Sequence, residues 1–193
     1  LGGWDGYLQT FSASGVSLGV DQFGSGGDDA AARIAVEGST LVVAGTENGR
    51  AVLRRYDLSD PQTPVLSATR DLGNLQGEIA SVALDSGRVI VTGTSSNSGL
   101  GEGGATNAHA GGRDAFVLRL DASLTVDAAD RVTFLGGTGD DTAVSASVQG
   151  GKVWITGQTG VVGEGSAQTA AGRLVRLDAD TGAIEWERAF QGK

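Results

Sequence analysis

Residues 111–159 read GGRDAFVLRLDASLTVDAADRVTFLGGTGDDTAVSASVQGGKVWITGQT, and this segment contains each pattern that recurs elsewhere in the chain. The first pattern is a strand-like run that ends at a glycine, found as LVVAGT (41–46), VIVTGT (89–94) and VWITGQ (153–158). The second ends in aspartate: RRYD (54–57), LRLD (118–121) and VRLD (175–178). The third is glycine-rich and acidic: FGSGGDD (23–29), LGNLQGE (72–78) and FLGGTGDD (134–141). Three patterns that recur in one order indicate repeats of roughly 45–65 residues.

Each repeat has the alternation of apolar with small or polar residues that is typical of short β-strands. The alternation is clearest in Ala32–Val36, Ala80–Leu84 and Val144–Val148. Turn signals such as Asp85-Ser86-Gly87 separate the strands, and no sustained helical period is present. Four short strands per repeat, with glycine at fixed places, predict an all-β fold of four-stranded antiparallel sheets, arranged radially as β-propeller blades.

The order of the patterns sets the blade boundaries. We expect complete blades at 30–73, 78–136 and 142–190, while residues 1–29 supply the third and fourth strands of an earlier blade and its junction. These are about three and a half blades, an open portion of a larger propeller. The expected partner is therefore the remainder of a longer propeller chain or another copy. Unpaired strand edges predict that residues 1–193 alone are oligomeric, aggregation-prone or marginally stable.

Composition excludes several classes of function. The chain has 193 residues, 23 acidic against 14 basic, and a net charge of -9, which argues against a nucleic-acid partner. It has no cysteine, so a disulfide scaffold, a zinc ribbon and thiol chemistry are excluded. No apolar run reaches the ~18 residues that a membrane span needs.

The segment 111–159 resembles the bacterial seven-bladed β-propeller repeat, the SBBP family. The shared features are the Asp-Ala-Phe-Val strand (114–117), the Gly-Gly-x-Gly-Asp-Asp junction (136–141) and the glycine-terminated strand (153–157). The resemblance extends over nearly the whole chain in three copies. It implies a propeller fold in a bacterial secreted or surface protein, in some relatives linked to flagellar systems, and it brings no defining catalytic residues.

A second resemblance is local. LDADTGAIEW (177–186) is similar to the Asp-x-x-Thr-Gly-x-x-x-Trp pattern of quinoprotein-type propeller repeats, which implies that Asp178, Thr181, Gly182 and Trp186 dock one blade on the next. It occurs once, and the plainer interpretation is a hairpin turn begun by an aspartate and followed by a packed aromatic residue.

Two sets of connections are expected at one end of the sheets, which we call the top face. They are the junctions between blades and the loops between the second and third strands of each blade. The candidate ligand or partner residues there are Asp28, Asp29, Glu78, Glu102, His109, Asp140, Asp141 and Glu164. Like charges repel, so we expect these acids to remain solvated; the alternative is a Ca²⁺ ion at Asp140 and Asp141.

The candidates for catalysis are few. Gly15-Val-Ser17-Leu-Gly19 matches a nucleophile motif, but it falls in a hairpin rather than in a strand-to-helix turn. His109 is the only histidine, and Asp178-x-Asp180-x-Gly182 lacks the glutamate of a calcium loop. The structural candidates, expected to pack blades together, are Trp154, Trp186, Arg55, Arg119 and Arg176.

The sequence therefore predicts a structural or interaction module without catalytic residues or a resident cofactor. We expect an extracellular, cell-surface or periplasmic location in a bacterium, in a setting that includes cell appendages. Its top face would bind a protein or a glycan. The alternative is a quinoprotein-like propeller enzyme or cofactor-binding domain.

Overall fold

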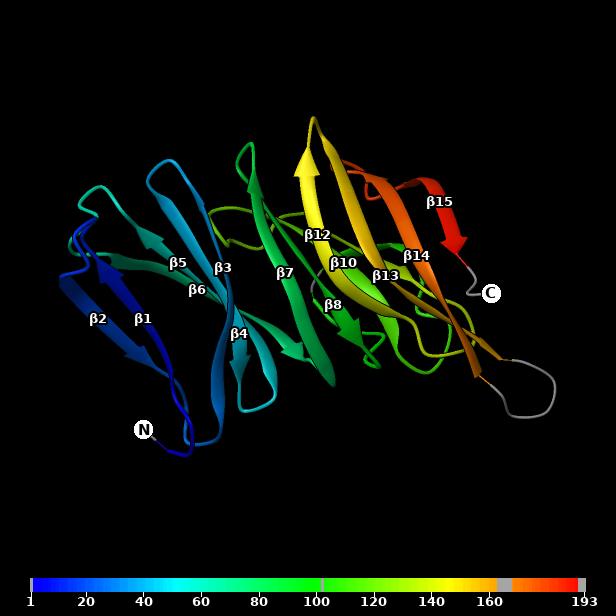
Figure 1. Cartoon of the computed structure of the whole chain (residues 1–193), viewed down its shortest axis with the longest axis horizontal. Coiled ribbons are helices and arrows are strands. Elements are labelled where there is room, and N and C mark those ends of the chain that lie inside the picture. The colour runs from blue at the N-terminus through cyan, green and yellow to red at the C-terminus, as the bar shows by residue number, and fades with distance from the viewer. Residues whose placement is uncertain (1, 102, 163–167, 191–193) are drawn as a thin grey trace.

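The computed structural model describes residues 2–101, 103–162 and 168–190, and in this part of the chain it contains strands and no helix (Figure 1). The strands are β1 (Gly6–Phe11), β2 (Ser17–Phe23), β3 (Asp29–Glu37), β4 (Thr40–Glu47), β5 (Arg50–Asp57), β6 (Val65–Asn74), β7 (Gly77–Asp85), β8 (Arg88–Ser95), β9 (Gly104–Asn107), β10 (Asp114–Asp121), β11 (Arg131–Leu135), β12 (Thr142–Gln149), β13 (Lys152–Val162), β14 (Gln168–Asp178) and β15 (Ile184–Phe190).

The strands form four sheets that follow one another along the chain. A half blade contains β1 and β2, the first blade β3-β4-β5-β6, the second blade β7-β8-β10-β11-β9, and the third blade β12-β13-β14-β15. Figure 1 shows them in an open row, with the two chain ends at opposite sides. The expectation of three and a half propeller blades is confirmed.

The glycine that ends each second strand is required by the strand beside it. The first strand of each complete blade has a register shift, between Ala31 and Arg33 in β3, with equivalents in β7 and β12. A Cβ on the facing glycine would collide with a backbone oxygen of that irregular segment; these glycines are Gly45, Gly93 and Gly157. The recurrent glycine therefore marks a β-bulge and a close backbone approach.

The core lies between the blades. In β10, Phe116 and Leu118 pack toward the first blade, while Ala115 and Val117 pack toward the third. Successive side chains of a strand point to opposite faces of its sheet, so a sheet with neighbours on both sides must be apolar on both faces. This arrangement is why the central strands read as nearly continuous apolar runs.

One strand departs from the sequence prediction. We expected the connection between the second and third strands of each blade to be a top-face loop, but in the second blade β9 lies within this connection and pairs in parallel with β11. The GATN sequence of β9 has no apolar alternation, and its four residues are all exposed. The segment therefore returns along the outer edge of the blade instead of extending from the top face.

Candidate functional site

The top face gathers the junctions between blades and the loops between second and third strands. Asn48 N donates to Asp28 O at 3.2 Å, Ser96 N to Gln76 O at 3.2 Å, and Asp141 N to Arg113 O at 2.6 Å. Each of these bonds joins a loop or strand start to the neighbouring junction. The face is thus a set of connections held together by backbone hydrogen bonds.

Two exposed acids of this face cap the segment before a third strand. Asp28 Oδ1 accepts from Trp4 N at 3.0 Å, and Asp140 Oδ1 accepts from Arg113 N at the same distance. The two contacts are equivalent in the repeats. Both aspartates remain exposed.

The acids that follow them are buried. Asp29 is 4% exposed and Asp141 0%. Asp29 accepts hydrogen bonds from Ser25 and, at 2.9 Å, from Asn48 N. Burial opposes ionisation of Asp29, but the bonds from Ser25 and Asn48 outweigh it and hold the pKa of this carboxyl below its ordinary value. Asp141 Oδ2 accepts from Gly137 N at 2.9 Å.

The carboxylate placed beside Asp141 belongs to Asp114, whereas Asp140 caps Arg113. A Cβ on Gly136 would collide with Asp114 Oδ1 and lie 3.0 Å from Asp141 Oδ2. Asp114 Oδ1 and Asp141 Oδ2 both lie close to this Cβ position, so the two carboxylates are neighbours. A calcium ion between Asp140 and Asp141, one of the sequence expectations, is therefore not the arrangement that this geometry favours.

The remaining top-face candidates are dispersed. Glu78 is exposed. His109 is held rather than free, because its ring packs edge-on against Phe134 at 5.2 Å and its Nε2 lies 3.3 Å from Ser95 O. Glu102 and Glu164 lie outside the described residues.

The other chemical motifs have structural surroundings. Ser17 begins β2 in the half blade, where its Oγ accepts from Gln9 Nε2 at 3.0 Å, while His109 belongs to the second blade. Asp178 binds Lys152 Nζ at 2.9 Å and caps the turn that follows it. Asp178 would be the first ligand of a calcium loop, but it is already engaged in these contacts.

The turn after Asp178 contacts the second blade. Gly182 O accepts from Thr133 Oγ1 at 2.9 Å, and Thr181 O accepts from Thr106 Oγ1 at 3.0 Å. Docking between blades is what the quinoprotein-like pattern implied for this turn. Trp186, the last residue of the quinoprotein-like pattern, packs against Trp154 with ring centroids 6.3 Å apart.

The three recurrent arginines have different partners. Arg119 Nη2 reaches Asp180 in the third blade at 3.5 Å. Arg55 instead binds Ser67 and Thr40 within the first blade, and Arg176 binds Glu185 within the third. Only Arg119 contacts a neighbouring blade in these pairs, so the three arginines do not form a ladder between blades.

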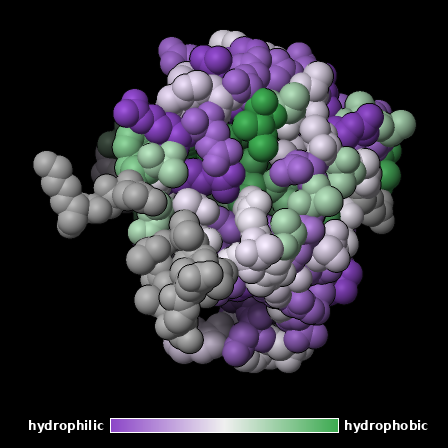
Figure 2. Space-filling view, turned by 90° about the vertical axis from the view of Figure 1, so that its right-hand side faces the viewer, coloured by the Kyte–Doolittle hydropathy of each residue, from purple (hydrophilic) through white to green (hydrophobic). Residues whose placement is uncertain are grey.

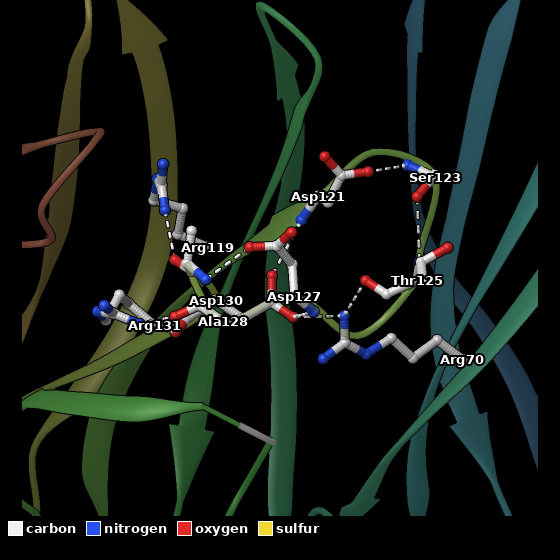
Figure 3. A network of polar contacts seen from close by, with 10 residues as sticks. Arg70, Arg119, Asp121, Ser123, Thr125, Asp127, Ala128, Asp130 and Arg131 are labelled. Carbon is white, nitrogen blue, oxygen red and sulfur yellow. Dashed lines mark hydrogen bonds and ion pairs between the residues drawn. The ribbon is translucent and has the colours of Figure 1, made fainter.

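A buried ion pair that the sequence did not predict joins the first and second blades (Figure 3). Arg70 Nη1 of β6 lies 2.8 Å from Asp130 Oδ2, and the two side chains are 5% and 1% exposed. Asp130 also accepts from Asp121 N at 3.1 Å and Asp127 N at 3.0 Å. Arg70 and Asp130 belong to none of the recurrent patterns, so the sequence carried no signal that joins them.

A groove of about 620 Å³ separates β1 from β3. Trp4, Tyr7 and Ile34 line it and are 80%, 64% and 59% exposed. Among the described strands, β1 is paired on one edge only.

The opposite end of the row also presents apolar side chains. Figure 2 shows this side of the molecule, where green hydrophobic residues lie among purple hydrophilic ones. Ile184, Trp186 and Phe190 of β15 are 39%, 39% and 48% exposed. No helix long and apolar enough to cross a membrane occurs in the described part of the chain, and no cluster of three or more metal-ligating side chains occurs there either.

No protein-family model matches the sequence. The regulatory protein FlaEY of Caulobacter vibrioides is 34% identical over 224 aligned residues, in a match that covers 100% of this chain and 24% of that protein. The chain thus spans about a quarter of the length of this curated relative.

A solved structure supports the propeller fold. A mutant apocarotenoid oxygenase from Synechocystis superposes with a TM-score of 0.50 at 12% identity, over 94% of this chain and 44% of the enzyme. A second mutant of that enzyme gives 0.42 at 9% identity, over 98% and 38%. The enzyme is a seven-bladed propeller. At this level of identity the likeness concerns the propeller architecture alone, and the chain is an open arc of such blades.

Proposed function

We propose that this chain is an interaction module, a rigid part of a propeller whose top face binds a protein or a glycan. We place it in a bacterial secreted or surface protein, in a setting that includes cell appendages. The similarity to the regulatory protein FlaEY over the whole chain supports a non-catalytic role. The resemblance to the SBBP family supports the location.

The observation that carries this proposal is the bonding of the top face. Its loops and junctions are tied to one another by the backbone bonds of Asn48, Ser96 and Asp141, and by the caps of Asp28 and Asp140. A surface that is already ordered loses little conformational entropy when a partner binds. Loops on a rigid scaffold are also where binding residues concentrate.

The exposed side chains indicate the chemistry of the partner. Asp28, Glu78 and Asp140 are exposed on this face, and the whole chain carries a net charge of -9. A negative surface favours basic groups over anions, and carboxylates also accept hydrogen bonds from hydroxyls. The partner is therefore basic or rich in hydroxyl groups.

A photo-crosslinking experiment tests the face directly. A benzophenone amino acid replaces Gln76 on the top face or Ser86 in the turn at the opposite end, in the full-length protein within its own cells. Both residues are exposed and have positive φ, at 45° and 53°, so the two sites are matched. We expect a discrete adduct from position 76 alone. Equal adducts from both positions, or none from position 76, would contradict the proposal.

The alternative, a quinone-binding propeller enzyme, has a separate test. The purified chain is mixed with a quinone cofactor, dialysed and examined for retained absorbance of the quinone. We expect none to be retained. Retained absorbance in a fixed ratio to protein would overturn the non-catalytic assignment without addressing the partner-binding face.

A further inference from the structure

The same pair of carboxylates occurs at two junctions. Asp114 lies beside Asp141 around Gly136, and Asp5 lies beside Asp29 around Gly24. A Cβ on Gly24 would collide with Asp29 Oδ2 and lie 2.9 Å from Asp5 Oδ1, which repeats the geometry at Gly136. In each case the first acid starts or precedes a third strand and the second follows the junction.

Each pair leaves a buried oxygen without a hydrogen bond. Oδ1 of Asp5 and Oδ1 of Asp114 both lack a partner, and so does Oδ1 of Asp141. Asp114 and Asp141 are 0% exposed. A buried carboxylate oxygen with no partner is unfavourable, and two such acids side by side also repel each other. In each pair the unpartnered oxygen of the strand acid, Asp5 Oδ1 or Asp114 Oδ1, lies close to the glycine that the second acid also approaches.

Arg173 forms an ion pair with Asp141 but balances at most one of the two charges of the Asp114–Asp141 pair. Arg173 Nη1 lies 3.8 Å from Asp141 Oδ1, beyond hydrogen-bond distance, and its guanidinium binds Glu187 at 3.0 Å. His109 Nδ1 lies 3.9 Å from Asp114 Oδ2. His109 is the only histidine of the chain, so it cannot explain a feature that the Asp5–Asp29 pair shares.

The cation beside the other pair is also engaged. Arg54 carries a positive charge that acts on Asp29 and favours its ionised form. Its Nη2 lies 2.8 Å from Glu47 Oε1, and its guanidinium covers the Phe23 ring at 4.6 Å. Each junction therefore holds two carboxylates and one arginine whose charge is shared with a glutamate.

The remaining junction shows that the two acids belong together. The bulge glycines and strand registers align Arg50 of β5 with Asp114 of β10, and Gly77 of β7 with Asp141. The middle copy therefore lacks both acids, and Arg50 there pairs with Asp71 at 2.5 Å. Joint presence in two copies and joint loss in the third are what a ligand shared between the acids would produce.

From these observations we propose that the two acid pairs are calcium sites, one at Asp5 and Asp29 and one at Asp114 and Asp141. Ca²⁺ is a hard cation that takes oxygen ligands, and two carboxylates balance its charge. Peptide and water oxygens would complete the coordination. Because each pair brings only two carboxylates, we expect weak binding, with dissociation constants of about 10⁻⁴–10⁻³ M. The sites fasten the blade junctions and do not depend on the proposed partner-binding function.

Equilibrium dialysis with radioactive calcium measures the stoichiometry of the purified chain. We expect two ions per chain in the wild type, and one in each of Asp114→Asn/Asp141→Asn and Asp5→Asn/Asp29→Asn. The control Glu78→Gln/Asp85→Asn removes the same charge elsewhere and should still bind two. No bound calcium in the wild type, or equal stoichiometry in all variants, would overturn the proposal.

Thermal unfolding gives a second readout. Calcium at ten times its dissociation constant should raise the midpoint by about 3–6 °C per occupied site, relative to sodium chloride of equal ionic strength. This rise should shrink in each pair variant. A midpoint that responds to pH but not to calcium would mean that the acids share a proton, which would refute the sites. If a double variant does not fold, the single variant Asp114→Asn replaces it.

Discussion

Individual aspartates stabilise the turns that follow the third strands of this chain. The aspartate that ends each third strand caps the turn beyond it: Asp57 Oδ1 accepts from Ser59 N at 2.8 Å, Asp121 Oδ1 from Ser123 N at 2.8 Å, and Asp178 Oδ1 from Thr181 N at 2.9 Å. This side-chain-to-backbone bond is the physical reason for the recurrent acid. Hydrogen bonds to the ionised form lower the pKa of all three carboxyls.

The stability that the Asp178 turn cap contributes depends on pH. Its bond from Lys152, followed by those from Thr181, holds the pKa of its carboxyl far below the unfolded value near 3.9. The unfolded state therefore binds the proton more readily, so the stabilisation is complete above about pH 5 and is lost as pH falls further. Asp178→Asn should be less stable than wild type at pH 7, and the difference should shrink below about pH 4. Urea midpoints across this range test it; a difference independent of pH would contradict the role of ionisation.

A second prediction concerns the glycines that face the β-bulges, of which Gly93 is an example. Gly93→Ala places a Cβ against Glu78 O and the Phe116 ring, so we expect a loss of about 1–3 kcal/mol in the free energy of unfolding. A Cβ added at Gly26 would have no atom within 4 Å, and Gly26→Ala should stay within about 0.5 kcal/mol. Denaturant titration compares the two. Equal effects would mean that glycine entropy, rather than the close approach, explains the pattern.

At the scale of the strands, blades dock through apolar faces and a few buried polar contacts. Arg70 and Asp130 are both more than nine-tenths buried and connect β6 with the loop before β11. Removing one member of such a pair leaves the other charge buried and unpaired. The contact therefore holds the two blades in register.

Arg70→Ala should lower the free energy of unfolding by about 3–5 kcal/mol. Arg50→Ala is the matched control, because Arg50 and Asp71 form an exposed pair, with side chains 51% and 48% accessible, and it should change stability by less than about 1 kcal/mol. Urea titration at neutral pH measures both. Similar small losses in the two variants would show that the buried pair does not connect the blades.

The strands illustrate what the sequence could predict. Gly45, Gly93 and Gly157 were visible because a bulge demands glycine at a fixed place in each repeat, and the apolar runs located the strands beside them. β9 was not predictable, since its GATN sequence has no alternation and its pairing depends on β11. The acid pairs were also missed: Asp114 and Asp141 lie in separate patterns, and only the folded junction brings them together.

As a whole, the described chain is a row of stacked sheets with two unlike ends. The third blade ends in β15, which leaves Trp186 and Phe190 partly exposed. At the other end, β1 has a partner on one edge only, beside the groove lined by Trp4 and Tyr7. An open strand edge next to exposed aromatic side chains is a surface on which another strand can add.

This open edge predicts association of the 193-residue chain in solution. Sedimentation velocity over a concentration series should show a mass above that of one chain. Tyr7→Lys/Gln9→Lys places charges along β1, which disfavours edge pairing, and should shift the distribution toward the monomer. Val126→Lys is the control, because Val126 is 60% exposed but lies in the loop between β10 and β11, so it should not change the distribution. A monomeric wild-type chain at all concentrations, or equal effects of both substitutions, would show that β1 is not the surface through which the blades recruit another strand.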